Sequence, residues 1–279
     1  MKSYKKIKNY TPKKFKRTAG ISKDDFLNLC DKAEDRIEKE KEQNRLKKRG
    51  LKDSEMSLRD RILLTLYYLR HHPIFQNLAD VFNISESCCY KIHKRYSGIV
   101  AKIAKSPNRK EPLDKSGDTL IIDVSEQPIE RPVKHQKYYY SGKKKRHAIK
   151  AQITASAETG QILSVVCAKG EQHDFTVFKE SDILIHTDST VLADSGYRGI
   201  QKYHKNSMIP IKKKKGIERS EEDKAYNKEL SKKRIFIENI NRFCKIFRIV
   251  KDVYRGKHKN YGLNWRLVAA LINMRYAPI

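Results

Sequence analysis

The chain has 279 residues, and its 61 Lys and Arg against 33 Asp and Glu leave a formal net charge of +28. Such an excess favours a polyanionic partner, nucleic acid first, because surface cations bind phosphates by displacing condensed counterions; a generally Lys-rich proteome is the lesser alternative. The longest apolar stretches, such as 62–69, fall well short of the roughly 20 residues that cross a bilayer, and the five cysteines lack zinc-ligand spacing. We therefore expect a soluble, cytoplasmic and nucleoid-associated protein with reduced thiols.

The N-terminal part of the chain has the apolar periodicity of helices. Residues 1–20 are rich in lysine, and we expect them to form a loosely ordered basic arm. Ser22 followed by Asp25 is typical of a helix N-cap, so a long helix is predicted from there to about Lys48, with Gly50 ending it. The same spacing predicts further helices at 57–70, 75–82 and 85–101.

The last two of these helices have the form of a helix-turn-helix. The turn Asn83-Ile84-Ser85 separates them, and Ser85 can cap the second helix, which in this motif enters the major groove of DNA. An ordinary helical bundle is the alternative, and the charge of the chain favours DNA binding. The predicted base and phosphate contacts are Ser87, Tyr90, Lys91, Lys94 and Arg95.

A segment rich in Pro, Ser, Asn and Gly, 105–117, is typical of a linker and places a domain boundary at about residue 115. We expect a helical DNA-binding domain at 1–115 and a second domain at 116–279. Strand-like runs then occur at 119–124, 147–155, 161–168, 191–193 and 208–211. The first three can form an antiparallel meander, and the last two alternate with helices, which predicts an α/β domain with a mixed sheet.

Two aspartates follow apolar runs of this second domain. Asp123 comes directly after 119–122, and Asp194 after 191–193, so both carboxylates are predicted at strand ends. If they meet a third carboxylate, Glu238, the three repel one another unless a cation lies between them. Oxygen-only ligands favour Mg²⁺ or Mn²⁺, and two such ions can promote the in-line displacement of a phosphodiester. Each residue alone has an ordinary alternative, a turn-forming Asp or a solvated Glu.

The third carboxylate lies on a predicted helix near the C-terminus. At 100° per residue, Glu238 falls on one polar stripe with Ser231, Arg234 and Lys245. The opposite side is apolar and is expected to be buried. Its residues are Phe236, Ile240, Phe243 and Phe247.

A basic run follows the predicted Ser141-Gly142 turn. Lys143, Lys144, Lys145 and Arg146 are expected to project from a hairpin and to contact phosphates, with a solvated hairpin tip as the alternative.

The chain resembles bacterial insertion-sequence transposases of the DDE type, most closely those of insertion sequence family 5, whose catalytic core has an RNase H-like fold. The matching stretches are DVSEQPIERP (123–132), YYYSGKKKRHAIKAQI (138–153), GEQHDF (170–175), LADSGYRG (192–199), IPIKKKKG (209–216) and RIFIENINRFCKIFRI (234–249). The resemblance covers nearly the whole chain. It implies an α/β fold class, an RNase H-like mixed-sheet catalytic domain preceded by an all-α helix-turn-helix domain.

This resemblance also implies roles for individual residues. Asp123, Asp194 and Glu238 would be the catalytic triad and the ligands of two magnesium or manganese ions. Arg234 and Lys245 would be the associated basic residues. Ser231 departs from the pattern, because many relatives have Tyr there.

Other matching residues are weaker candidates. His173 and Asp174 would approach the metal site from behind the ligands, with a helix-capping role for Asp174 as the alternative. Glu126, Gln127 and Arg131 follow the first aspartate closely and are expected to position a DNA end.

The implied activity is cleavage of double-stranded DNA at the inverted ends of the element, followed by strand transfer into target DNA. Holding two ends together implies a homo-oligomer. Two alternatives stay open: a non-catalytic DNA-binding regulator derived from a transposase, and an RNase H-like endonuclease without strand transfer.

Overall fold

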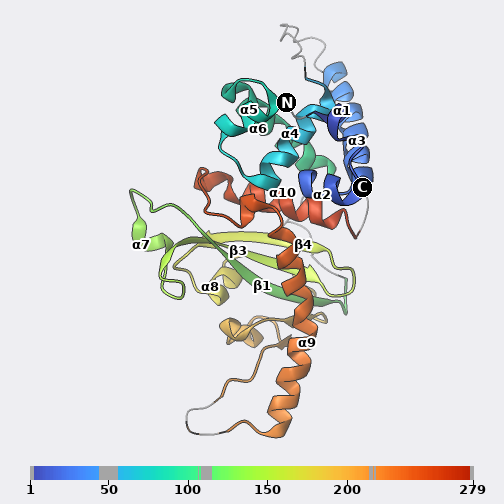
Figure 1. Cartoon of the computed structure of the whole chain (residues 1–279). Helices are drawn as coiled ribbons and strands as arrows, with labels where there is room; N and C mark the ends of the chain where they lie inside the picture. Colours follow the sequence, from blue (N-terminus) through green and yellow to red (C-terminus); the bar gives the residue numbers. More distant parts are fainter. Residues whose placement is uncertain are drawn as a thin grey trace. The chain divides into compact units, whose positions relative to one another are not determined.

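The computed structural model describes residues 3–43, 56–105, 107, 115–213, 216 and 218–276 (Figure 1). The chain divides into two compact units. One contains the chain up to Ser106 together with Ile246–Ile249, and the other contains Pro107–Lys245 and Val250–Tyr276. None of the helices in the described ranges is both long and apolar enough to cross a lipid bilayer.

The first unit is helical, as the periodicity predicts. The Ser22 hydroxyl accepts from the Asp25 N–H at 3.0 Å and donates to the Asp25 carboxylate at 2.6 Å, which confirms the predicted cap. The expected helix end at Lys48 and Gly50 lies outside the described residues. The helices are α1 (Tyr4–Ile7), α2 (Pro12–Ala19), α3 (Lys23–Gln43), α4 (Leu58–His71), α5 (Phe75–Phe82) and α6 (Glu86–Ile103).

The expectation of a loosely ordered basic arm is wrong. Residues 4–19 contain α1 and α2, and these helices bury Ile7, Phe15 and Ala19. The Phe15 ring packs edge-on against Phe26 of α3, with 5.4 Å between the ring centroids. The high lysine content hid these few anchors, because a short helix needs only one apolar side chain per turn to dock on a neighbour.

The helix-turn-helix is formed by α5 and α6. Asn83 takes the left-handed conformation (φ 56°) that ends α5, and the Ser85 hydroxyl accepts from the Cys88 N–H to begin α6. Ile92 and Ile99 of α6 are buried, as expected for the side that faces the helical core. The predicted turn and its cap are therefore confirmed.

Aromatic rings and a histidine pack between α4, α5 and α6. Tyr68 stacks on Phe75 with 4.8 Å between centroids, and the His93 ring lies 4.3 Å from Tyr68. Burial lowers the pKa of His93 to about 4, and His72 contributes to the same shift. The neutral imidazole is therefore a structural member of this cluster.

The second unit is an α/β domain with a mixed sheet, which confirms the predicted fold class. Among the described residues six strands form the sheet, in the order β2-β3-β1-β5-β6 with β4 paired to β3. The pairs β1–β3 and β3–β4 are antiparallel, as in the predicted meander, while β1–β5 and β5–β6 are parallel. The strands are β1 (Thr119–Pro128), β2 (Tyr140–Ser141), β3 (Arg146–Ser156), β4 (Ile162–Lys169), β5 (Thr190–Leu192) and β6 (Ser207–Met208).

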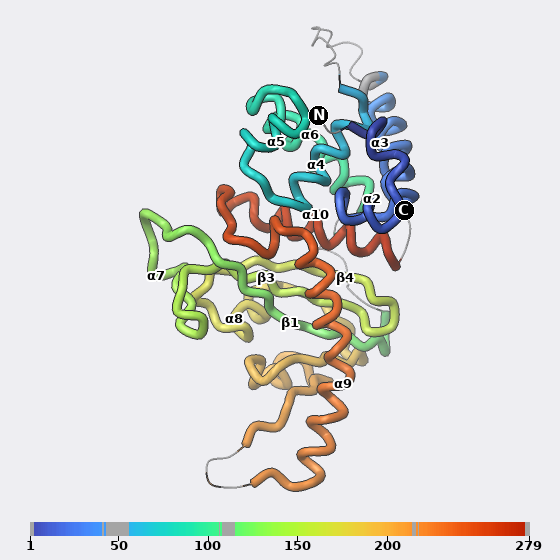
Figure 2. Tube along the Cα trace, in the orientation of Figure 1, coloured from blue at the N-terminus to red at the C-terminus, as the bar shows by residue number. Residues whose placement is uncertain are grey.

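Helices cover both faces of this sheet. Helix α10 (Tyr261–Asn273) packs against β4 on one face, and α8 (Asp174–Lys179) lies on the other (Figure 1). Helix α9 (Glu221–Cys244) contacts β1, and its N-terminal half extends past the sheet (Figure 2). The shorter elements are α7 (Gln136–Tyr139) and the 3-10 turns η1 (Ser195–Tyr197), η2 (Ile200–Lys202), η3 (Arg248–Val250) and η4 (His258–Asn260).

The buried face of α9 differs from the predicted one. Phe236 and Phe243 are only half-buried, and Phe247 lies beyond the end of the helix at Cys244. The chain leaves the helix at Lys245, and Phe247 packs beside Gly20 in the helical unit. The side chains that α9 buries are those of Leu230, Ile237, Ile240, Asn241 and Cys244.

The helical unit should lose stability in acid through His93. Because the folded state lowers the His93 pKa from 6.5 to about 4, the unfolded state binds a proton first as the pH falls. We expect the free energy of unfolding to decrease by about 2–3 kcal/mol between pH 6.5 and 4. Urea unfolding followed at several pH values measures this slope. His93→Gln should reduce it, whereas an unchanged slope would contradict the assignment.

Candidate active site

The site forms where two parallel strands separate. Strands β1 and β5 pair in register up to Ile121 and Leu192. Beyond that point β5 ends, whereas β1 continues beside β3 to Pro128. Asp123 and Asp194 each lie two residues past the last pair, so both follow the split at the same offset. The carboxyl ends of parallel strands are where crevices for ligands form in open α/β sheets.

Asp123 therefore lies within β1 and not at its end, contrary to the prediction. The apolar run that signals the strand stops at Ile122, but β1 extends further through alternating buried and exposed residues. The pairing to β5, not the strand itself, ends near Asp123. For Asp194, which follows β5, the predicted strand-end position is confirmed.

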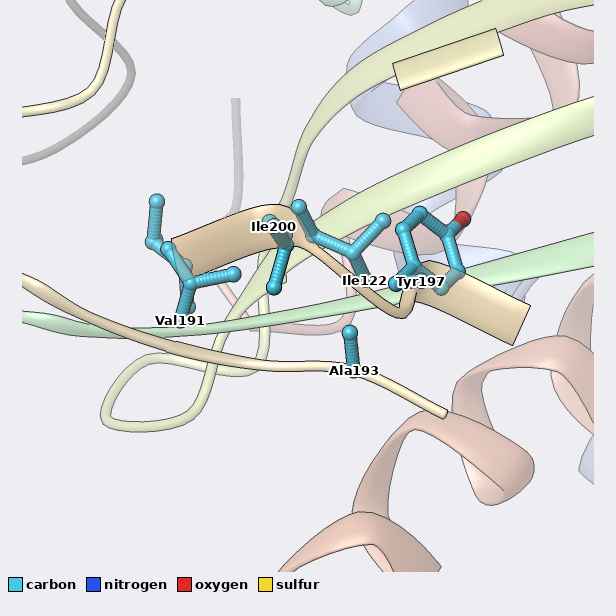
Figure 3. Close-up of a cluster of buried hydrophobic side chains, with 6 residues drawn as sticks. Ile122, Val191, Ala193, Tyr197 and Ile200 are labelled. Atoms are coloured by element: carbon cyan, nitrogen blue, oxygen red, sulfur yellow. The ribbon is translucent and has the colours of Figure 1, made fainter. Parts of the chain in front are cut away.

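A buried apolar cluster supports the two aspartates from beneath. Ile122 precedes Asp123 and Ala193 precedes Asp194, and both are fully buried in this cluster. Figure 3 shows these two residues with Val191, Tyr197 and Ile200 packed together. Asp194 also caps η1, because its Oδ1 accepts from the Gly196 N–H at 2.8 Å. The backbone that leads into each carboxylate is thus held by packing.

Helix α9 contacts Asp123 through two side chains on one of its faces. Asn241 Nδ2 donates to Asp123 Oδ2 at 2.6 Å, and Arg234 Nη2 lies 3.9 Å from Asp123 Oδ1. Both are largely buried, with 7% of Asn241 and 16% of the Arg234 side chain exposed. Sequence reasoning missed Asn241, although it lies on the polar stripe one turn after Glu238 and could have been found by its spacing.

The surroundings of the Asp123 carboxyl shift its pKa in opposite directions. Burial raises its pKa to about 6, and the nearby Asp194 charge adds to the rise. Arg234 opposes the rise most strongly, with smaller help from the Val124 N–H and from Lys245, the C-cap residue of α9. Arg234 and Lys245, predicted as basic residues associated with the triad, thus act electrostatically on Asp123. The two carboxylates carry a charge that a cation would relieve.

The structure does not assemble the third carboxylate with the other two. Glu238 is exposed on α9, one turn from both Arg234 and Asn241 and on the same helix face. Within the part of the chain that the structure describes, no three acidic, histidine or cysteine side chains lie close enough to hold one metal ion. Ser231 is exposed two turns before Glu238.

Asp174 lies beside Asp194 from the other face of the sheet. It occupies the first position of α8, and His173 is the N-cap residue, so the capping alternative for Asp174 is wrong. A Cβ placed on Gly196 would lie 2.9 Å from Asp194 Oδ1 and 3.3 Å from Asp174 Oδ2. His173 is exposed and lines a cavity of about 490 Å³ that Asp174 and Gly196 also border.

The space at Gly196 bears on whether the residues fit a divalent cation. Glycine leaves open a gap between the Asp194 and Asp174 carboxylates that any larger side chain would crowd. Asp123 and Asp194 supply only oxygen ligands, which suits Mg²⁺ or Mn²⁺ better than zinc. The chemistry of these two carboxylates therefore fits the divalent ions that the sequence predicts.

Two of the residues expected to position a DNA end do not face solvent. The Gln127 side chain is buried and donates to the Asp252 carbonyl at 2.7 Å. Glu126 is held in a buried ion pair with Lys150. Alternation along β1 turns these side chains toward the packed faces, so their expected contact with DNA is wrong. Arg131 is exposed and donates to Gln136 at 3.0 Å.

The predicted DNA contacts of both units are accessible. The basic run 143–146 is exposed at the turn between β2 and β3, as the hairpin prediction requires. On α6 the exposed side is opposite to the buried Ile92 and Ile99. It carries Ser87, Tyr90, Lys91, Lys94 and Arg95.

Removing the Asp123 charge should stabilise the metal-free protein. Because the folded state raises the Asp123 pKa to about 6, stability is greatest at low pH and is lost as the carboxyl ionises. At pH 7.5 we expect Asp123→Asn to raise the free energy of unfolding by about 2–3 kcal/mol. The difference should vanish near pH 4. Urea unfolding in the presence of a chelator measures it, and a less stable variant at pH 7.5 would contradict the electrostatic account.

Known protein families and a known protein match this chain over most of its length. Residues 122–273 match the family model described as DDE superfamily endonuclease, and residues 54–106 match the helix-turn-helix of DDE superfamily endonuclease. The chain is 35% identical over 276 residues to the probable transposase for insertion sequence element IS702 of Microchaete diplosiphon, covering 98% of each chain. The chain therefore belongs to the DDE transposases of insertion sequences.

Proposed function

We propose that this chain cuts DNA at the ends of its own element and joins the freed ends to target DNA, with Asp123, Asp194 and Glu238 as the catalytic triad. The observation that carries the proposal is the meeting of Asp123 and Asp194 at the split between β1 and β5. Helix α9 is anchored to the same point by Asn241. Glu238 follows on that helix face, so α9 supplies the third carboxylate.

The side chains around the crevice have separable tasks. Asp123 and Asp194 bind the divalent cations, two magnesium or manganese ions, which when bound activate the attacking oxygen and stabilise the leaving oxygen of the phosphodiester. Asn241 fixes the rotamer of Asp123 by occupying Oδ2 and leaves Oδ1 toward Arg234. Arg234 and Lys245 keep Asp123 ionised and offset the repulsion between carboxylates and DNA phosphates.

The helical unit binds the inverted ends of the element. Its helix α6 presents two lysines, an arginine, a tyrosine and a serine to solvent, and this combination suits a helix that enters the major groove. The hairpin tip 143–146 adds phosphate contacts in the catalytic unit. We assign DNA binding to 1–115 and catalysis to 116–279. Two DNA ends must be held at once, so the working form is a homo-oligomer on DNA.

Cleavage of DNA that carries the element's ends tests the triad. With Mg²⁺, Glu238→Gln should lower the cleavage rate by about 10³-fold because the third carboxylate is lost. Glu222→Gln, which removes an exposed glutamate at the start of the same helix, should cleave like wild type. The measurement is the rate of product formation on labelled DNA at fixed protein concentration.

The same assay separates the competing functions. Full cleavage by Glu238→Gln would show that the triad is assigned wrongly. A wild-type protein that binds the ends but never cuts them would be a regulator. Cut products without joined products would identify an endonuclease without strand transfer.

The role of α6 has its own test in the salt dependence of binding. Replacing Lys91 or Lys94 by Ala should lower the affinity for end DNA and reduce the slope of log K against log salt by about 0.9 per lost phosphate contact. Lys102→Ala, at the far end of the same helix, is the matched control and should keep the wild-type slope. If the Lys91 and Lys94 variants kept the wild-type slope, as Lys102→Ala should, α6 would be ruled out as the DNA-contacting helix.

A further inference from the structure

A buried lysine lies on the opposite face of the sheet from Arg234 and Asn241. Lys150 of β3 is 6% exposed, and its ammonium group has three oxygen partners. Nζ donates to the Gln172 carbonyl at 2.6 Å and to Asp174 Oδ1 at 2.9 Å, and it lies 3.5 Å from Glu126 Oε1. Three donors thus meet three acceptors.

In this buried network one ammonium group is shared between two carboxylates, those of Glu126 and Asp174. Glu126 is directly opposite Lys150 in the β1–β3 register, and its other oxygen accepts from the Ser141 hydroxyl at 2.9 Å. A buried ammonium group is tolerated only when it is paired and hydrogen-bonded, and removing it leaves its carboxylate partners uncompensated. Lys150 is therefore the cation on which two buried acids depend.

One of these acids reaches the candidate active site. Lys150 holds Asp174 Oδ1, and Asp174 Oδ2 lies on the side of Gly196, where a Cβ would be 3.3 Å from it. Gly196 also donates its N–H to Asp194 at 2.8 Å. The carboxylates of Asp174 and Asp194 thus flank the same glycine, and each repels the other unless a cation neutralises it.

We propose that Lys150 is a positioning residue of the active site: by neutralising and fixing Asp174, it keeps the Ser195–Tyr197 turn, and with it the Asp194 carboxylate, in place beside Asp123. The proposal rests on the proposed function in taking Asp194 as a metal ligand. Without the Lys150 charge, the Asp174 carboxylate repels the Asp194 carboxylate and displaces the Ser195–Tyr197 turn from its place beside Asp123. When Asp174 is also made neutral, this repulsion is removed.

The test compares Lys150→Met with the double variant Lys150→Met/Asp174→Asn. Two readouts apply: Mn²⁺ binding by titration calorimetry, and hydrogen exchange of the Gly196 amide, which reports on its bond to Asp194. Lys150→Met should weaken Mn²⁺ binding by at least about tenfold and speed the Gly196 exchange by a similar factor. Both effects are expected because the displaced Asp194 carboxylate neither ligates the ion nor accepts from the Gly196 N–H. The double variant should return both values to within about threefold of wild type.

The matched control is Lys150→Met/Glu126→Gln, which neutralises the other acid of the network and leaves Asp174 charged. It should remain as defective as Lys150→Met. The proposal is overturned if Lys150→Met keeps wild-type exchange at Gly196, or if neutralising Glu126 restores the protein and neutralising Asp174 does not.

The same variants separate an effect of Lys150 on folding from an effect on the active site. If Lys150→Met does not fold but the Asp174→Asn double variant does, charge compensation at Asp174 is supported. If that double variant fails to fold as well, Lys150 acts through packing and the proposal is wrong. A wild-type protein that neither binds Mn²⁺ nor cuts DNA would defeat the proposed function, while the Gly196 exchange would still decide the role of Lys150.

Discussion

The candidate site depends on one constraint: two parallel strands that share a register and then separate. As long as β1 and β5 stay paired, their side chains pack into the apolar core. Past Ile121 and Leu192 the two strands are no longer paired, and Asp123 and Asp194 follow this point at the same offset. The buried cluster beneath fixes both backbones. Two acids are therefore held close together although their mutual repulsion opposes it.

The groups around the two aspartates compensate part of this concentrated negative charge. From the α9 side, Asn241 and Arg234 stabilise ionised Asp123. From the α8 side, Lys150 neutralises Asp174 next to Asp194. Cationic side chains thus lie near Asp123 on one face of the sheet and near Asp174 on the other. Burial of Asp123, with a smaller contribution from the Asp194 charge, still raises the Asp123 pKa, and a bound divalent cation would offset this cost of ionising the carboxyl.

In the proposed function, recognition and chemistry are served by different units, each with its own core. The helical unit buries apolar side chains between α4, α5 and α6 and leaves the cationic side of α6 to solvent. The α/β unit carries the acids. The basic composition of the chain suits both tasks, because a polyanionic substrate must approach a cluster of carboxylates and the net charge of +28 makes that approach favourable.

Local patterns were sufficient to predict most elements. Capping serines mark the starts of α3 and α6, and apolar runs mark β1, β3, β4 and β5, because these signals depend on neighbours in the sequence. The pairing of Asp123 with Asp194 was predicted from their equivalent positions after such runs. The polar stripe of α9 located Arg234 and Glu238 on one face, and its extension would have found Asn241.

What the sequence by itself determined is most of the elements, though not α1 and α2, together with the family pattern and the acids at the ends of apolar runs. Only the tertiary structure decided that β1 continues past Asp123, that Phe247 leaves α9 for the helical unit, and that Glu126 is buried against Lys150. It also decided that Asp174 lies beside Asp194. These outcomes depend on partners far away in the chain, and neither helical spacing nor strand alternation carries information about which distant side chain will neutralise a buried charge.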